Sequence, residues 1–152
     1  MEEVILCEAP IEKQRLFNIV RQSFGIGRSG HHIQDHNERM LKELAFQQTS
    51  FCDRVFIWTS KQDPRSYDEY RPNDESTTRQ ITEMPYEEIL SAIREYLLRR
   101  RSESKDSLVK ETSVKLGFNR LGNTVKSTIE AAIDKALDEG ALKIIGRMVS
   151  LP

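Results

Sequence analysis

This sequence lacks most of the signals that mark secreted and membrane proteins. The 152 residues include only two cysteines, Cys7 and Cys52, and these do not have CxxC spacing. We therefore expect reduced thiols in a cytoplasm rather than a disulfide framework. No apolar run approaches the roughly 20 residues that span a bilayer. The acidic start, Met1-Glu2-Glu3-Val4, lacks the basic region of a signal peptide. A soluble, cytoplasmic protein is the prediction.

Motifs of catalysis and of metal binding are also missing. There is no glycine-rich GK[ST] loop and no nucleophile elbow. His32 and His36 are one helical turn apart and His31 is adjacent, but the cysteines have no ligand spacing with them and no HExxH motif exists. We expect exposed histidines, no enzymatic activity, no metal and no cofactor.

A strong charge of one sign is absent as well. The formal net charge is −1, which argues against a strongly basic nucleic-acid binder. The charged residues are, however, unevenly distributed along the sequence. From Arg94 to Lys126 nine basic residues face four acidic ones, whereas Ser127 to Glu139 holds one lysine and four acids. One part of this region is therefore positive and its neighbour negative.

What the sequence does contain is an internal repeat. The segment from Phe24 to Gly30 returns 92 residues later as the segment from Leu116 to Gly122. Apolar positions on both sides follow the same spacing. A spacing of 93 then places Phe56 and Trp58 on Val149 and Leu151, which favours core filling over base stacking for the aromatic pair. Repetition at a fixed spacing indicates two copies of one small unit.

The second copy is the clearer one, and we expect it to span residues 82–152. Helical spacing of apolar residues after Pro85 predicts a first helix that ends near Arg99–Arg101. A second helix, capped by Ser104 or Asp106, stops at Gly117, and a third begins near Gly122 and ends at Gly140. Two short apolar segments around Gly146-Arg147 indicate a hairpin.

The first copy, residues 1–59, repeats this order from its second helix onward. Ile11 to Phe24 and Gly30 to Ala45 are predicted helices, and Phe46 to Thr59 is a predicted hairpin. The apolar residues Val4 to Leu6 are too few for a full first helix, so we expect that helix to be missing or another element to take its place. Residues 60–81 are polar and turn-rich, which is typical of a linker. Its tyrosines and Arg71 suggest partial order against a domain, and Arg79 to Thr82 suggests a short strand.

Three helices followed by a hairpin is the winged-helix order. The predicted fold class is therefore mainly α with short β-hairpins (α+β), built as tandem winged-helix-like (helix-turn-helix) repeats. In helix-turn-helix proteins the start of the third helix meets DNA, and free N–H groups at a helix start favour phosphate. The candidate nucleic-acid-binding residues at these turns and helix starts are Arg28, Ser29, His32, Arg120, Asn123 and Lys126.

A second basic group lies at the expected end of the helix that begins after Pro85. It consists of Arg99, Arg100, Arg101 and Lys105. These side chains are candidates for sequence-independent contacts to phosphates. Two plainer interpretations remain open: the glycines and arginines only build the turns, and the Arg99 group only complements the dipole of its helix.

The sequence resembles an uncharacterised domain family found at the C-terminus of very large bacterial helicase-like proteins. The shared features run from Glu8-Ala9-Pro10-Ile11 and Gly27-Arg28-Ser29-Gly30 through Val55-Phe56-Ile57-Trp58, Arg79, Ile81 and Met84-Pro85-Tyr86-Glu87-Glu88 to Leu116-Gly117-Phe118-Asn119-Arg120-Leu121-Gly122. In such proteins a superfamily I helicase core, often with a very-short-patch-repair-like nuclease domain, precedes this part. The resemblance implies a bacterial parent that unwinds or cuts DNA in repair or defence, and it supplies no catalytic residues here.

From these observations we expect a non-catalytic accessory module that contacts duplex DNA. The alternative is a protein-interaction module that docks onto other domains of a helicase-like parent or pairs with a second copy of the chain.

Overall fold

The fold is described from a computed structural model, which covers residues 1–28 and 30–152. The chain divides into two compact units, Met1–Pro64 and Arg65–Pro152, and each is described by itself. Their boundary falls inside the segment that the sequence marks as a linker.

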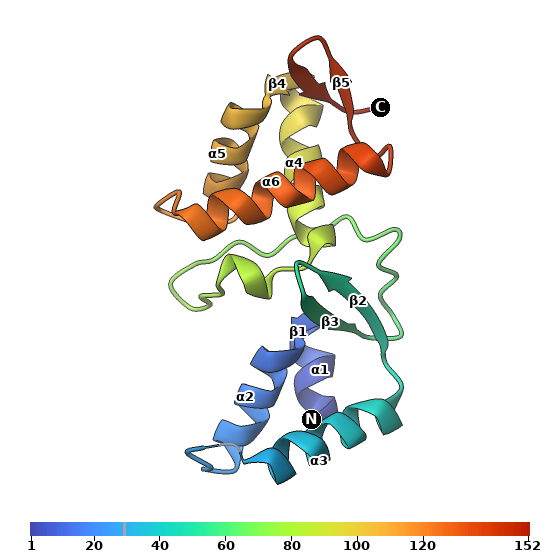
Figure 1. Ribbon diagram of the computed structural model, residues 1–152, viewed down its shortest axis with the longest axis vertical. Coiled ribbons are helices and arrows are strands. Elements are labelled where there is room, and N and C mark those ends of the chain that lie inside the picture. Colours follow the sequence, from blue (N-terminus) through green and yellow to red (C-terminus); the bar gives the residue numbers. More distant parts are fainter. Residues whose placement is uncertain (29) are drawn as a thin grey trace. The chain divides into compact units, whose positions relative to one another are not determined.

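The first unit contains three helices and a small sheet (Figure 1). In chain order these are α1 (Glu2–Glu8), β1 (Ile11–Glu12), α2 (Lys13–Ser23), α3 (His31–Leu44), β2 (Gln47–Phe51) and β3 (Arg54–Trp58). The antiparallel sheet has the order β1-β3-β2. Its core joins one side chain or more from each helix to the sheet and consists of Ile5, Ile11, Leu16, Phe17, Val20, Leu41 and Ile57.

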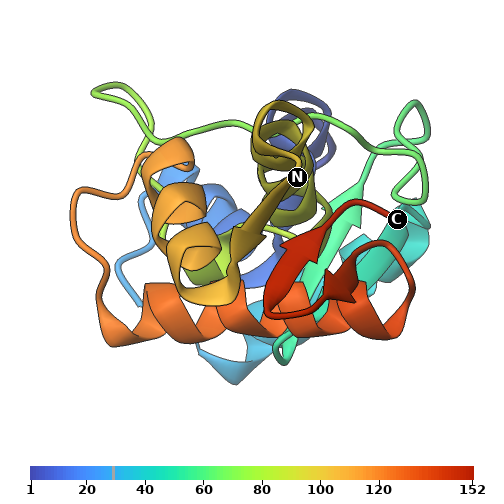
Figure 2. The same ribbon diagram turned by 90° about the horizontal axis from the view of Figure 1, so that it is seen from above.

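The second unit repeats this plan. The second unit begins with irregular backbone over residues 65–80, here called the strap, and with the 3-10 helix η1 (Ile81–Glu83). The elements that follow are α4 (Tyr86–Arg100), β4 (Ser102–Ser104), α5 (Lys105–Lys115), α6 (Asn123–Asp138), β5 (Lys143–Ile145) and β6 (Met148–Ser150). The sheet order β4-β6-β5 matches that of the first unit. In Figure 2, α6 runs along the unit from the turn after α5 to the hairpin.

Local signals place the equivalent helices at the same positions of the repeat. The side chain of Glu12 accepts a hydrogen bond from Arg15 N at 2.9 Å and caps α2, and that of Ser104 accepts one from Ser107 N at 3.3 Å and caps α5. Both caps satisfy donors that the first helical turn leaves free. The predicted fold class is confirmed: the chain is an α+β protein made of tandem winged-helix-like units.

Three expectations about local structure are wrong. The first unit does have a first helix, because Glu2 to Glu8 form the two-turn α1 and Ile5 packs into the core. The stretch Arg79 to Thr82 is not a strand. Instead η1 forms there, because the Glu83 carboxylate accepts a hydrogen bond from Gln80 N at 2.7 Å and closes a capping box. Ile11 and Glu12 belong to strand β1 and not to the helix predicted from Ile11.

The change of the repeat spacing to 93 is also wrong. In the first unit Ile11 pairs with Ile57, and in the second unit Glu103 pairs with Val149. Both members of the second pair lie 92 residues after their counterparts in the first, so the hairpins keep the spacing of 92. Pairing with the first strand fixes the register, since a shift by one residue would turn every side chain of the last strand to the other face. Trp58 therefore corresponds to Ser150 and is still a core residue, with no exposed surface.

Candidate nucleic-acid interface

The turns after α2 and α5 have the same backbone in both units. Gly25 N donates to Gln22 O at 3.0 Å and Ile26 N to Arg21 O at 3.2 Å. In the second unit Gly117 N donates to Val114 O and Phe118 N to Ser113 O, both at 3.0 Å. This pair of bonds is the Schellman motif, which needs a left-handed residue after the helix. Gly25 and Gly117, with φ of 68° and 85°, supply it.

The next helix of each unit starts at a glycine. Gly30 caps α3 and Gly122 caps α6, both with extended backbone and without a side-chain cap among the described residues. Glycine has no side-chain oxygen, so the cap residue itself does not satisfy the first N–H groups of the helix. Together with the helix dipole, they favour an anion at this point.

Arg28 and Arg120 lie in these turns, two residues before the capping glycine. Both side chains are exposed, and no residue in the described part of the chain forms an ion pair with either. In the first unit Arg21 Nη1 donates to Gly27 O at 3.0 Å and holds the turn from the side of α2. Each unit therefore has an exposed arginine two residues before a glycine-capped helix start. Ser29 lies outside the described residues.

The remaining candidates at the helix starts are also on the surface. His32 and Asn123 are exposed in the first turns of α3 and α6. Lys126 is exposed too, and its Nζ lies 3.9 Å from Glu130 Oε1. A surface pair at this distance contributes little and leaves the lysine available to a stronger anion.

The second predicted group does not join the first. Arg99 to Arg101 lie at the end of α4 and Lys105 begins α5, whereas Arg120 follows the other end of α5 (Figure 1). The 11 residues of α5 place the Arg99 group about 16 Å from the turn that contains Arg120. Lys105 Nζ contacts Asp134 Oδ1 at 2.5 Å, and Arg99 Nη2 lies 3.7 Å from Glu95 Oε1. The structure thus gives two separate basic positions in the second unit.

The part of α6 that follows Lys126 carries negative charge. Asp134 and Asp138 are exposed and Glu130 is half-buried, while Lys135 is paired with Glu139 at 2.8 Å. Carboxylates along this helix would repel phosphates. Any contact of α6 with nucleic acid is therefore restricted to its first two turns.

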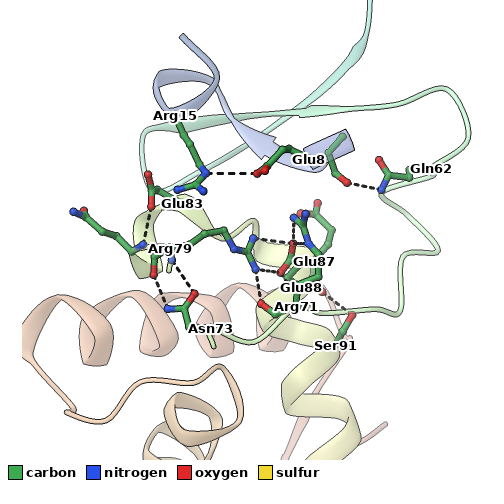
Figure 3. Close-up of polar contacts among 12 residues, drawn as sticks. Glu8, Arg15, Gln62, Arg71, Asn73, Arg79, Glu83, Glu87, Glu88 and Ser91 are labelled. Carbon is green, nitrogen blue, oxygen red and sulfur yellow. Dashed lines mark hydrogen bonds and ion pairs between the residues drawn. The ribbon is translucent and has the colours of Figure 1, made fainter. Parts of the chain in front are cut away.

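Sequence reasoning missed a buried ionic cluster at the start of α4 (Figure 3). Glu88 has no exposed surface; Arg71 Nη2 lies 2.6 Å from its Oε1 and Arg79 Nη2 lies 2.7 Å from its Oε2. Asn73 exchanges hydrogen bonds with the Arg79 backbone at 2.7 and 2.8 Å. Glutamates in the first turn of a helix are usually exposed, so nothing in the sequence indicated that Glu88 is buried.

A second polar cluster attaches the strap to α4 and α5. The Tyr70 hydroxyl donates to Glu95 Oε2 at 2.8 Å, and Lys115 Nζ donates to Glu95 Oε1 at 2.9 Å. Hydrogen bonds from Lys115 and Tyr70 hold the pKa of Glu95 below its usual value. Together with the Glu88 cluster, this contact agrees with the expectation that the segment is partly ordered.

His31, His32 and His36 are exposed on α3. Within residues 1–28 and 30–152, no three His, Cys, Asp or Glu side chains are placed to hold a metal ion. In the same residues, no helix has the length and apolar character required to cross a bilayer.

The fold defines a class, that of tandem winged-helix-like proteins, which use their surfaces for several purposes. No protein-family model, curated protein or solved structure matches this chain.

Proposed function

We propose that the chain is a non-catalytic accessory module that binds duplex DNA through phosphate contacts at its two turns. The observation that supports this proposal is the repeated geometry at Arg28 and Arg120. In both units an exposed arginine, unpaired with any described residue, lies two residues before a glycine that caps a helix.

Guanidinium groups bind phosphate oxygens through two parallel hydrogen bonds, and a free helix start adds backbone donors. Asn123 and Lys126 extend this surface along the first turns of α6, as His32 does on α3. Because the chain has a net charge of −1, we expect weak binding. Its salt dependence reflects the number of phosphate contacts. The acidic part of α6 keeps the helix from lying in a groove along its whole length.

The resemblance to C-terminal domains of helicase-like proteins supports a setting for this activity. In that setting the module holds duplex DNA near a helicase core during repair or defence. The group of Arg99, Arg100, Arg101 and Lys105 is then a second phosphate contact, at the other end of α5.

Fluorescence anisotropy with a labelled duplex tests the proposal at two salt concentrations. Replacing one phosphate-binding arginine lowers the slope of log affinity against log salt by about 0.9. We expect this change for Arg28→Ala and for Arg120→Ala. Lys61→Ala is the control, since it removes an equal charge from an exposed position outside both turns. Equal slopes for all three variants would contradict the proposal.

A second candidate function is self-association through the hairpin of the second unit. Strand β5 is at the edge of its sheet, and Ile144 and Ile145 are 61% and 56% exposed there. An exposed apolar edge strand can pair with another chain. Absence of DNA binding at low salt, together with a dimer in sedimentation experiments, would favour this candidate.

A further inference from the structure

The strap of the second unit brings two carboxylates to the turn that follows α5. Asp74 and Glu75 line a hollow of about 440 Å³, which residues 117–119 of that turn also line. Arg120, the proposed phosphate contact, follows these turn residues directly in the chain. The strap therefore places two acidic side chains near the point at which we expect a phosphate to bind.

The backbone of Asn73 connects the strap to this turn. Asn73 N donates a hydrogen bond to Leu116 O at 2.9 Å, at the end of α5. A Cβ on Gly117 would overlap the carbonyl oxygen of Asn73, so the two backbones are in direct contact. Because Asp74 is the next residue, its distance from the turn is set by this contact.

The loop of residues 73–79 is also attached to α4. The Asn73 side chain donates to Arg79 O at 2.7 Å and accepts from Arg79 N at 2.8 Å, which closes the base of the loop (Figure 3). Arg79 Nη2 lies 2.7 Å from Oε2 of the buried Glu88. The loop is therefore held at both of its ends, and this limits the positions that Asp74 and Glu75 can take.

The charges of the two carboxylates are not neutralised by a neighbour. Both side chains are exposed, and neither forms an ion pair within residues 1–28 and 30–152. Asp74 accepts hydrogen bonds from Ser76 Oγ, Ser76 N and Thr77 N at 2.7, 2.8 and 2.8 Å. The bond from the Ser76 hydroxyl, together with the two backbone bonds, holds the pKa of Asp74 below its usual value. This carboxylate is therefore ionised at neutral pH.

We propose that Asp74 and Glu75 weaken the binding of phosphate at the Arg120 turn, so that the strap is an autoinhibitory element of the second unit. This inference rests on the proposed function, since it concerns the same phosphate contact. A phosphate at this turn is repelled by both carboxylates. By Coulomb's law in water, two like charges at about 10 Å lower the affinity about threefold at low salt.

The test is fluorescence anisotropy with a labelled duplex at low salt, on the full chain carrying Arg28→Ala. This background removes the proposed contact of the first turn, so the affinity depends mainly on the second unit. Asp74→Asn combined with Glu75→Gln should strengthen binding about threefold, and the gain should fade as the salt concentration rises. Asparagine keeps a side-chain oxygen for the bonds from Ser76 and Thr77, so the loop should keep its conformation.

Glu43→Gln combined with Asp138→Asn is the matched control, because it changes the net charge by the same amount. Both residues are exposed in the last turns of α3 and α6, about 18 Å or more from the starts of these helices. The control should give a smaller gain in affinity. An equal gain in the control, or a strap gain that persists after Arg120→Ala, would overturn the proposal.

The same titrations distinguish a failure of this inference from a failure of the proposed function. If Arg28→Ala and Arg120→Ala each lower the salt slope but the strap variant binds no more tightly, the autoinhibitory contact alone is rejected. If no variant binds the duplex at low salt, both proposals are rejected.

Discussion

At the scale of single residues, Glu88 is a buried charge of the second unit that is paired with two arginines. It lies without exposed surface between Arg71 and Arg79, which belong to the strap before α4. Buried charges are stable only when they are paired and hydrogen-bonded. This carboxylate therefore joins the strap to the first turn of the helix.

We predict that Glu88→Gln lowers the free energy of unfolding of the second unit by about 3 kcal/mol, since Arg79 would keep a buried charge without its carboxylate. Urea unfolding followed by circular dichroism measures the change. Glu130→Gln is the control, because Glu130 lies 3.9 Å from Lys126 at the surface, and it should change stability by about 0.5 kcal/mol or less. Equal effects of the two substitutions would contradict the assigned role of Glu88.

At the scale of elements, the turn that follows the second helix of each unit has one backbone but two surroundings. Gly25 and Gly117 both have positive φ. A Cβ at Gly25 would meet nothing within 4 Å, whereas one at Gly117 would overlap the backbone of Asn73. The strap thus approaches the second turn so closely that only glycine fits.

Alanine at the two positions should therefore have different effects. Gly25→Ala carries only the cost of a left-handed alanine, about 1 kcal/mol. Gly117→Ala adds the displacement of Asn73, a further 1–3 kcal/mol by the usual cost of overpacking. Gly140→Ala is a control within the second unit, since its φ is 74° and its Cβ would be unobstructed. Denaturant unfolding of the three variants gives the comparison, and a Gly117→Ala effect no larger than the others would refute the close approach.

The elements also show how far sequence reasoning reached. The repeat located α2, α3, α5 and α6 because capping residues, glycine stops and apolar spacing are local signals. It missed β1 and β4, which are too short to show a period and have no hairpin turn beside them. The equally short β5 and β6 were predicted because the Gly146-Arg147 turn joins them. Helix α1 was missed because seven residues are too few to be helical without tertiary packing. Of the candidate site, the exposed turn arginines could be located from sequence, whereas the separation of the Arg99 group from Arg120 follows only from three-dimensional packing.

At the scale of the whole molecule, the pKa values of four glutamates in the second unit make its stability depend on pH. Hydrogen bonds from Lys115 and Tyr70 lower the pKa of Glu95, a bond from Lys135 lowers that of Glu139, and a backbone bond from Ser104 lowers that of Glu103. Burial raises the pKa of Glu87, which acts in the opposite direction. Three of these four groups therefore favour the folded state in their ionised form.

A carboxylate with a lowered folded pKa stabilises the protein above its unfolded pKa, and this contribution is lost as the pH falls through the folded value. We predict that the second unit is less stable at pH 3 than at pH 7, with the loss beginning near pH 4.5, the unperturbed value for Glu. Circular dichroism during urea unfolding at a series of pH values measures it. Glu95→Gln should reduce the pH dependence, and an unchanged dependence would contradict the contribution of Glu95.

The burial of Trp58 has an optical consequence. It is the one tryptophan of the chain and lies in β3 of the first unit, whereas the four tyrosines, Tyr67, Tyr70, Tyr86 and Tyr96, all lie in the second. Fluorescence excited at the red edge of indole absorption therefore follows the first unit alone. Near-ultraviolet signals of the phenol rings follow the second, so one unlabelled sample reports whether the two melt together or in succession.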